Sequence, residues 1–289
     1  MHSEPIPGQA RAASTVVMLR DGSAGLEAFL LERHGLSEIL AGVHVFPGGK
    51  LDREDADPDT LARLDQPLAV LHDALGEPGL DHETAAALHV AAIREVFEET
   101  GVLFARGADD ALAQRAWALH REGHAFGEVL ALLGLTLQTG NMLPWSRWIT
   151  PLVGGVIRKR FDTRFFVVAM QAGQQARHDD HEAVASVWLT PRAALEQYRD
   201  EKIELAPPQI MTLAHLMRHT TVAGALAEAR GRRPPLVQPE SFHQDGLRVL
   251  CYPGDERHPV RERAMPGPTR LCHDGQRFKP IGGFDEFFR

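Results

Sequence analysis

The chain has few of the residues that mark secreted, disulfide-stabilised or nucleic-acid-binding proteins. Its 289 residues include two cysteines, which are too few for a disulfide framework or a cysteine zinc site. We therefore expect Cys251 and Cys272 to be reduced thiols. The formal net charge of −8 argues against a general nucleic-acid surface.

Membrane and export signals are also missing. No apolar run approaches the roughly 20 residues that a membrane span requires. The first residues lack the apolar segment of a secretory signal, and the final Phe287-Phe288-Arg289 is not a peroxisomal address. We expect a cytoplasmic protein without membrane contact. The apolar fraction of 44% suffices for a sizeable core.

The most informative segment is REVFEETGV at residues 94–102. Its carboxylates Glu95, Glu98 and Glu99 are spaced i, i+3 and i+4, so on a helix they share one face. Like charges there destabilise an isolated helix by a few tenths of a kcal/mol per pair, and a cation would relieve this repulsion. Clustered hard oxygen ligands favour Mg²⁺ or Mn²⁺. The alternative, a solvated acidic helix closed by a glycine, would not need the Gly-Gly turn at residues 46–49.

Hydrophobic patterning predicts a mixture of strands and helices. We expect strands at 14–20, 26–33, 145–158, 165–170, 182–189 and 247–252. We expect helices at 85–100, 109–120 and 125–133, with two more beginning at Pro191 and Pro207. The order predicts an α/β or α+β sandwich with a mixed sheet. We expect a flexible tail at 1–12, one domain at 13–235 and an extension at 236–289 that adds a small hairpin.

Residues 94–102 resemble the core of the Nudix box, Arg-Glu-aliphatic-x-Glu-Glu-x-Gly-aliphatic. The resemblance implies a Nudix-type α/β/α sandwich and hydrolysis of a diphosphate by attack of water on phosphorus. It further implies that Glu95, Glu98, Glu99 and the carbonyl of Gly49 bind Mg²⁺ or Mn²⁺, and that Arg94 orients a box glutamate. The three glutamates and Arg94 are thus the predicted catalytic residues.

The predicted box is enlarged. Between Gly49 and Arg94 lie 44 residues, where the usual box has about 13, so about 31 residues are extra. We place this insertion at about 53–84. It could be a surface excursion or a wall over the substrate, and the two alternatives stay open. The glutamate expected six residues after Gly49 is Asp55, to which we assign no role.

Four further strings suggest a branch of the family: GVHVFPGGKLD (42–52), WSRWITP (145–151), RFDTRFF (160–166) and LAPPQ (205–209). With the expanded box they resemble the peroxisomal type of coenzyme A diphosphatase. That branch cleaves CoA or acyl-CoA to 3′,5′-ADP and (acyl) 4′-phosphopantetheine. Alternatives are a Nudix pyrophosphatase for ADP-ribose, NADH or a dinucleoside polyphosphate, and a non-catalytic binding module. The intact carboxylates favour an enzyme.

Substrate contacts are predicted outside the box. Arg33 matches one arginine of a motif found in another group of CoA-cleaving Nudix enzymes, although Glu38 stands in place of the second. Arg158 and Arg160 could contact a 3′-phosphate. Glu182, in the acidic run 179–182, is a candidate for the catalytic base. We expect a small-molecule nucleotide diphosphate substrate and leave a homodimer open.

Two tryptophans could contact the base of a nucleotide. Trp145 and Trp148 are three residues apart, so on a regular strand they face opposite ways and at most one could stack on adenine. Burial in the core is the favoured interpretation.

Overall fold

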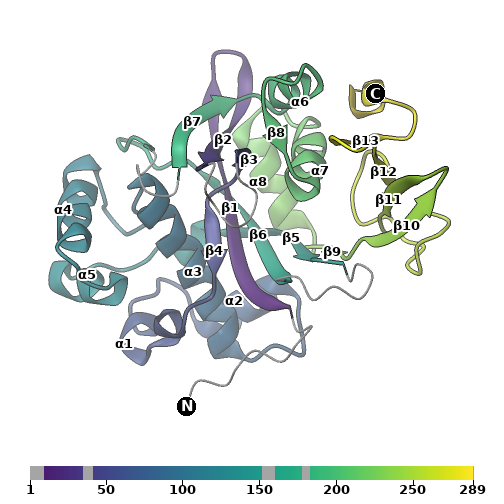
Figure 1. Cartoon of the computed structure of the whole chain (residues 1–289). Helices are drawn as coiled ribbons and strands as arrows, with labels where there is room; N and C mark the ends of the chain where they lie inside the picture. Colours follow the sequence, from purple (N-terminus) through teal and green to yellow (C-terminus); the bar gives the residue numbers. More distant parts are fainter. Residues whose placement is uncertain (1–9, 35–41, 152–159, 178–182, 289) are drawn as a thin grey trace.

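The computed structural model describes residues 10–34, 42–151, 160–177 and 183–288, and shows a mixed sheet with helices on both faces (Figure 1). The strands of this sheet are β1 (Arg11–Gly22), β2 (Gly25–Arg33), β3 (Val43–Val45), β4 (Gly48–Lys50), β5 (Leu143–Ile149), β6 (Phe161–Ala169), β7 (Ala183–Leu189), β8 (Glu204–Leu205) and β9 (Leu236–Val237). Within the described ranges their order is β8-β3-β2-β1-β6-β5-β9, with β4 paired to β1 and β7 to β2. β1 runs antiparallel to β2 and parallel to β6, so the sheet is mixed as predicted.

Helices come from the box, the insertion and the second half of the chain. The α-helices are α1 (Pro58–Leu61), α2 (Leu68–Leu75), α3 (His82–Thr100), α4 (Asp110–Arg121), α5 (Phe126–Leu133), α6 (Pro191–Arg199), α7 (Pro207–Leu216) and α8 (Val222–Gly231). The short 3₁₀ helices are η1 (Arg53–Ala56), η2 (Thr139–Asn141) and η3 (Phe284–Phe288). No helix within the described part of the chain is long and apolar enough to cross a membrane.

Apolar side chains along β1 point alternately to the two faces of the sheet, and both faces are covered by helices. Val16 and Met18 belong to the apolar cluster that contains α3, whereas Val17 and Leu19 belong to the cluster that contains α6 and α7. Successive side chains of a strand point to opposite faces, so the unbroken apolar run in β1 serves two cores. The predicted layered arrangement of helix, sheet and helix is confirmed.

Helix α3 lies at the centre of one layer and carries the box glutamates. It begins where the side chain of Asp81 accepts a hydrogen bond from the backbone N–H of Thr84 at 2.7 Å. It ends at Gly101, whose φ of 71° is left-handed and suits glycine. The hydroxyl of Ser14 in β1 donates to the carbonyl of Leu88 at 2.7 Å, which fastens the helix to the sheet.

The insertion is folded against the core. Leu71 and Leu75 of α2 are buried, and α2 packs along α3. The next turn supplies Glu77, whose carboxylate accepts two hydrogen bonds from Arg164 of β6, at 2.6 and 2.9 Å, and pairs with Arg147 of β5 at 2.8 Å. The insertion is therefore joined to α3 and to two neighbouring strands of the sheet, which a surface excursion would not be.

The last fifty residues form a second sheet. Its strands are β10 (Glu240–Gln244), β11 (Leu247–Cys251), β12 (Arg270–His273) and β13 (Phe278–Pro280), paired in that order and antiparallel. Tyr252 and Phe287 are buried in the same cluster as α6 and α7. Cys251 and Cys272 are buried free thiols on neighbouring strands but not directly paired positions, and the prediction of reduced thiols is confirmed.

The two tryptophans both lie in the core. Trp145 is 1% exposed and Trp148 is 5% exposed, and both belong to the cluster on the α7 side of the sheet. The register of β5 against β6 shifts between Pro144 and Ser146, and a bulge of this kind re-aims side chains. The expectation of opposite faces, which assumed a regular strand, is therefore wrong, and core burial is confirmed. Residues 152–158 of the predicted strand lie outside the described residues.

Candidate active site

The Gly48-Gly49 turn brings main chain into contact with the glutamates of α3. β4 pairs with β1, where Gly48 lies opposite Thr15, and the backbone N–H of Gly48 donates to Glu99 Oε2 at 2.9 Å. A Cβ atom added at Gly49 would lie 2.4 Å from Glu95 Oε1. Only glycine fits this approach without moving the carboxylate.

Arg94 is the hub of the carboxylate cluster. Its Nη1 donates to Glu95 Oε1 and to Glu98 Oε2, both at 2.9 Å, so these two carboxylates are neighbours. Its Nη2 donates to the carbonyl of Lys50 at 3.0 Å, which ties α3 to the turn. The predicted grouping of the turn, Arg94 and the three glutamates on one side of α3 is thus present in the geometry.

Asp55 completes this cluster, and sequence reasoning gave it no role. Both of its oxygens accept from Arg94, Oδ1 from Nε at 2.8 Å and Oδ2 from Nη2 at 3.0 Å. It is 2% exposed and is held in η1, where Oδ2 also accepts from the backbone N–H of Asp52 at 2.8 Å. Its offset of six residues from Gly49, which is the usual box spacing, was the signal that could have identified it.

A family model described as the NUDT19 Nudix domain matches residues 10–216, which include the turn, η1 and the whole of α3. The chain belongs to this Nudix family.

Curated relatives and a solved structure agree with the assignment to the Nudix family. The chain is similar to the acyl-coenzyme A diphosphatase NUDT19 of Xenopus laevis, with 25% identity over 83% of this chain and 73% of the relative. The Homo sapiens protein of the same name is 28% identical over 80% of this chain and 72% of its own. The crystal structure of a NUDIX hydrolase from Alicyclobacillus acidocaldarius is 29% identical, with a TM-score of 0.63 over 76% of this chain and 96% of that one. The predicted Nudix-type fold is confirmed.

The electrostatics of the Nudix box favour a bound cation. Within 3.5 Å of Arg94 lie the carboxylates of Asp52, Asp55, Glu95 and Glu98, four negative charges around one positive charge. Burial raises the pKa of Glu98 above its ordinary value, although the charge of Arg94 opposes this. Burial acts to lower the pKa of Arg94, but the hydrogen bonds that Arg94 donates to Asp55 and the surrounding negative charges outweigh it and raise that pKa. The donor set of hard oxygens and the excess of negative charge both fit Mg²⁺ or Mn²⁺.

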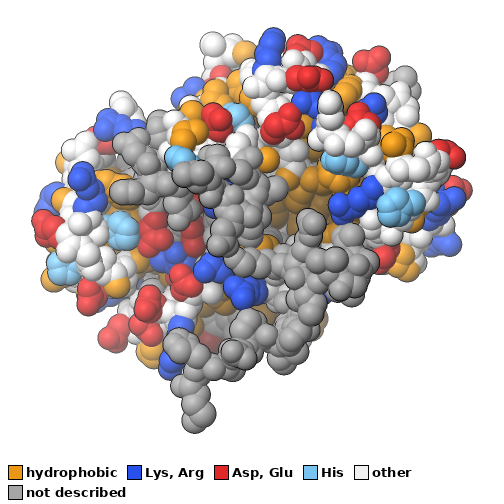
Figure 2. Space-filling model, viewed as in Figure 1, with side chains coloured by type: hydrophobic (Ala, Val, Ile, Leu, Met, Phe, Trp, Pro, Cys, Tyr) orange, Lys and Arg blue, Asp and Glu red, His pale blue; other side chains and the backbone are white. Residues whose placement is uncertain are grey.

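A cavity of about 140 Å³ opens beside Glu98. Its walls include Thr60 of α1, His120 of α4 and Phe126 of α5, so the insertion and the α4–α5 hairpin flank the box. Figure 2 shows acidic side chains gathered on this part of the surface. The cavity has room for several water molecules. A larger hollow of about 400 Å³ around Asp255 lies in the C-terminal sheet and contains no box residue among the described residues that line it.

The structure describes two of the four predicted substrate residues, Arg33 and Arg160. Arg33 is the last residue of β2, and its carbonyl accepts a hydrogen bond from the backbone N–H of Gly42 at 3.1 Å. Arg160 precedes β6 and donates from Nε to the carbonyl of Thr150 at 2.9 Å. Arg158 and Glu182, with the rest of the acidic run 179–182, lie outside the described residues. All four roles stay predictions.

Proposed function

We propose that this Nudix enzyme hydrolyses the diphosphate of CoA or of acyl-CoA thioesters. The observation that carries the proposal is the expanded box, whose turn and α3 assemble around Arg94 although 44 residues separate Gly49 from Arg94. Support comes from the relatives, since those from Xenopus laevis, Homo sapiens and Gallus gallus are named acyl-coenzyme A diphosphatases and match over about 80% of this chain.

Within this proposal the box residues have separate tasks. Glu95, Glu98 and Glu99, with the carbonyl of Gly49, are the proposed ligands of Mg²⁺ or Mn²⁺. When bound, such an ion neutralises diphosphate charge and lowers the pKa of a coordinated water. Arg94 positions Glu95 and Glu98 through hydrogen bonds from its Nη1 atom. The guanidinium is itself held in place by its hydrogen bonds to the Asp55 carboxylate.

The proposed reaction is hydrolysis of the phosphoanhydride bond. Water adds to one phosphorus of the diphosphate, the bridging P–O bond breaks, and the two phosphate products share the oxygen and protons of the water. From CoA the products are 3′,5′-ADP and 4′-phosphopantetheine. The Gly48 amide holds Glu99 and the Arg94 guanidinium holds Glu98, so both side chains are oriented before substrate binds.

A substrate panel tests this function. The full chain is incubated with Mg²⁺ or Mn²⁺ and with CoA, acetyl-CoA, a long-chain acyl-CoA, NADH, ADP-ribose or diadenosine tetraphosphate, and products are identified by mass spectrometry. We expect 3′,5′-ADP from the CoA compounds with the highest kcat/KM. If AMP is released from NADH or ADP-ribose faster than 3′,5′-ADP is released from CoA, the substrate is another nucleoside diphosphate derivative and the proposal for CoA is wrong. Absence of turnover on the whole panel would indicate a binding module.

A further inference from the structure

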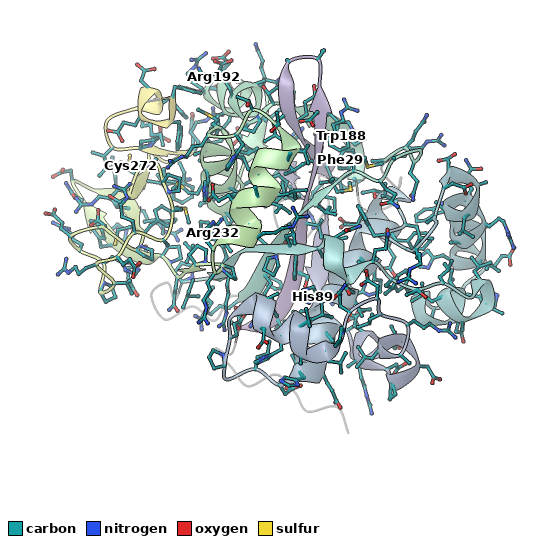
Figure 3. All side chains as sticks on the ribbon, turned by 180° about the vertical axis from the view of Figure 1, so that it is seen from behind. Phe29, His89, Trp188, Arg192, Arg232 and Cys272 are labelled. Atoms are coloured by element: carbon teal, nitrogen blue, oxygen red, sulfur yellow. The ribbon has the colours of Figure 1, made fainter. Side chains whose placement is uncertain are left out.

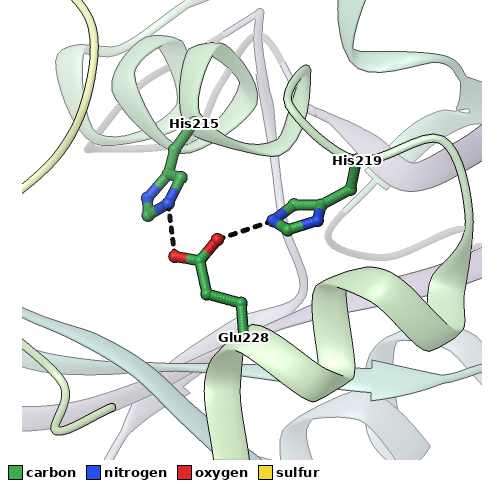
Figure 4. Close-up of side chains that lie close together, drawn as sticks. All are labelled: His215, His219 and Glu228. Carbon is green, nitrogen blue, oxygen red and sulfur yellow. Dashed lines mark hydrogen bonds and ion pairs between the residues drawn. The ribbon is translucent and has the colours of Figure 1, made fainter. Parts of the chain in front are cut away.

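A second group of metal-ligand side chains lies on the other face of the sheet from α3. His215 is in the last turn of α7, His219 follows four residues later in the turn before α8, and Glu228 projects from α8 (Figure 4). His215 Nε2 lies 2.7 Å from Glu228 Oε1, and His219 Nε2 lies 2.8 Å from Glu228 Oε2. One ligand atom from each residue lies within 4.8 Å of the other two.

We propose that His215, His219 and Glu228 form a zinc-binding site that links α7 to α8. Two imidazole nitrogens and one carboxylate are a donor set that Zn²⁺ accepts, with a fourth position left for water. This set differs from the all-oxygen box, which suits Mg²⁺ or Mn²⁺.

Side-chain rotations can bring the three ligand atoms to the spacing that the ion requires. With Zn–N and Zn–O distances of about 2.0–2.1 Å, tetrahedral ligands lie about 3.3 Å apart. The observed contacts of 2.7 and 2.8 Å join the two rings to different oxygens of Glu228, and the three ligand atoms lie within 4.8 Å of one another. Side-chain rotations that move these atoms by about 1 Å would bring them to tetrahedral spacing. The side chains of His219 and Glu228 are 13% and 27% exposed, which leaves a route from solvent.

The site is held by neighbouring groups. Arg232 Nε donates to Glu228 Oε1 at 2.8 Å, and Arg232 Nη1 donates to the carbonyl of Trp145 at 2.9 Å. Figure 3 shows Arg232 beside the end of α8. The ring of Trp145 lies 4.5 Å from that of His215, with the Arg232 guanidinium 4.4 Å from the indole. Ligating carboxylates commonly accept such an outer hydrogen bond, so Arg232 orients Glu228 for the metal.

The protonation state of His215 also suits a metal. Burial lowers the pKa of His215 to about 4, despite the raising effect of Glu228, so the ring is neutral at pH 7. A neutral imidazole donates to Glu228 from Nε2 in the absence of metal. Moving that proton to Nδ1 frees the Nε2 lone pair for coordination, with no net release of protons from the ring.

A competing interpretation is a metal-free clamp, in which two rings and Arg232 only hydrogen bond to Glu228. Metal titration separates the two. The full chain, stripped with a chelator, is titrated with Zn²⁺ against a chromophoric zinc indicator, with excess Mg²⁺ present to occupy the box. We expect one Zn²⁺ per chain with a dissociation constant at or below the micromolar range, and on the order of 100-fold weaker binding in His219→Ala and Glu228→Gln. The matched control is His243→Ala, which removes an exposed histidine of β10 and should bind like wild type.

Two outcomes would overturn the zinc site. One is no stoichiometric Zn²⁺ uptake by the wild-type chain, and the other is unchanged uptake in both ligand variants. Co²⁺ substitution of the wild type keeps the test decisive if a variant fails to fold. An intense tetrahedral d–d spectrum is expected, and a weak octahedral spectrum would reject the proposed four-coordinate site. Because the readout is metal binding, its result is independent of the substrate panel.

Discussion

Both carboxylate oxygens of Asp55 accept hydrogen bonds from the guanidinium of Arg94, although 39 positions separate the two residues. The pair joins η1, at the start of the insertion, to the helix that carries the box glutamates. Arg94 in turn contacts Glu95, Glu98 and the turn, so Asp55 acts on the proposed metal ligands through Arg94.

Asp55→Asn should therefore lower both stability and turnover. The amide offers one neutral acceptor oxygen where the carboxylate offers two charged ones, and its NH₂ group faces the donors of the buried Arg94, which should cost about 2–3 kcal/mol of unfolding free energy. Urea unfolding measures this, with Asp59→Asn, an exposed position of α1, as control. Equal stability of the two variants would contradict the role given to Asp55.

Glu98→Gln should lower kcat by about 10³ or more, because a ligand that positions the metal acts in the transition state. The fold should persist, since losing one of several like charges relieves repulsion. Steady-state kinetics on CoA with Mn²⁺ and a thermal melt measure the two effects. Glu122→Gln, an exposed change just after α4, serves as control, and a near-wild-type rate for Glu98→Gln would remove Glu98 from the site.

Gly49→Ala should abolish most activity. The added Cβ would lie 2.4 Å from Glu95 Oε1, so the carboxylate or the turn must move, and even a small misplacement of a catalytic group is costly. Gly79→Ala is the matched control, because a Cβ there meets nothing within 4 Å. Comparable kcat values for both variants would show that the close packing of Gly49 on Glu95 is dispensable.

His89 should make stability depend on pH. Burial lowers its pKa to about 4, while Nδ1 donates to the carbonyl of Ala85 at 2.9 Å. In the unfolded chain the same histidine titrates near pH 6.5. Below that pH the unfolded state binds more protons than the folded state, so stability falls as pH drops from 6.5 towards 4. His89 alone should contribute a loss of about 2 kcal/mol between pH 7 and 5. Unfolding of His89→Leu at both pH values should show a smaller difference, and an unchanged difference would reject this assignment.

The sequence predicted the central elements well because their signals are local. The apolar run of β1 and the capped, periodic α3 each identify themselves, and the box spacing places the glutamates on one face. The helices beginning at Pro191 and Pro207 were found from proline at the first helical turn. These are features that neighbouring residues determine.

What the sequence left open depends on contacts between distant segments. The bidentate pair of Asp55 with Arg94 and the linkage of Glu77 to two strands have no local pattern. The bulge that turns Trp145 into the core is a departure from regular pairing. Helix α8 was not predicted, since its short alanine-rich stretch has weak periodicity, although Thr221 caps it. The C-terminal hairpin proved to be a larger antiparallel sheet.

The sheet at the C-terminal end shares its interior with the catalytic half of the chain. The Tyr198 hydroxyl donates to the carbonyl of Phe278 at 2.8 Å and accepts from its N–H at 2.9 Å, while Tyr252 contacts Trp148 edge-on. A truncated chain ending at residue 216, where the family match stops, would leave this aromatic surface open to water. The segment that the family model matches therefore lacks part of the packing that covers Tyr198 and Trp148 in the full chain.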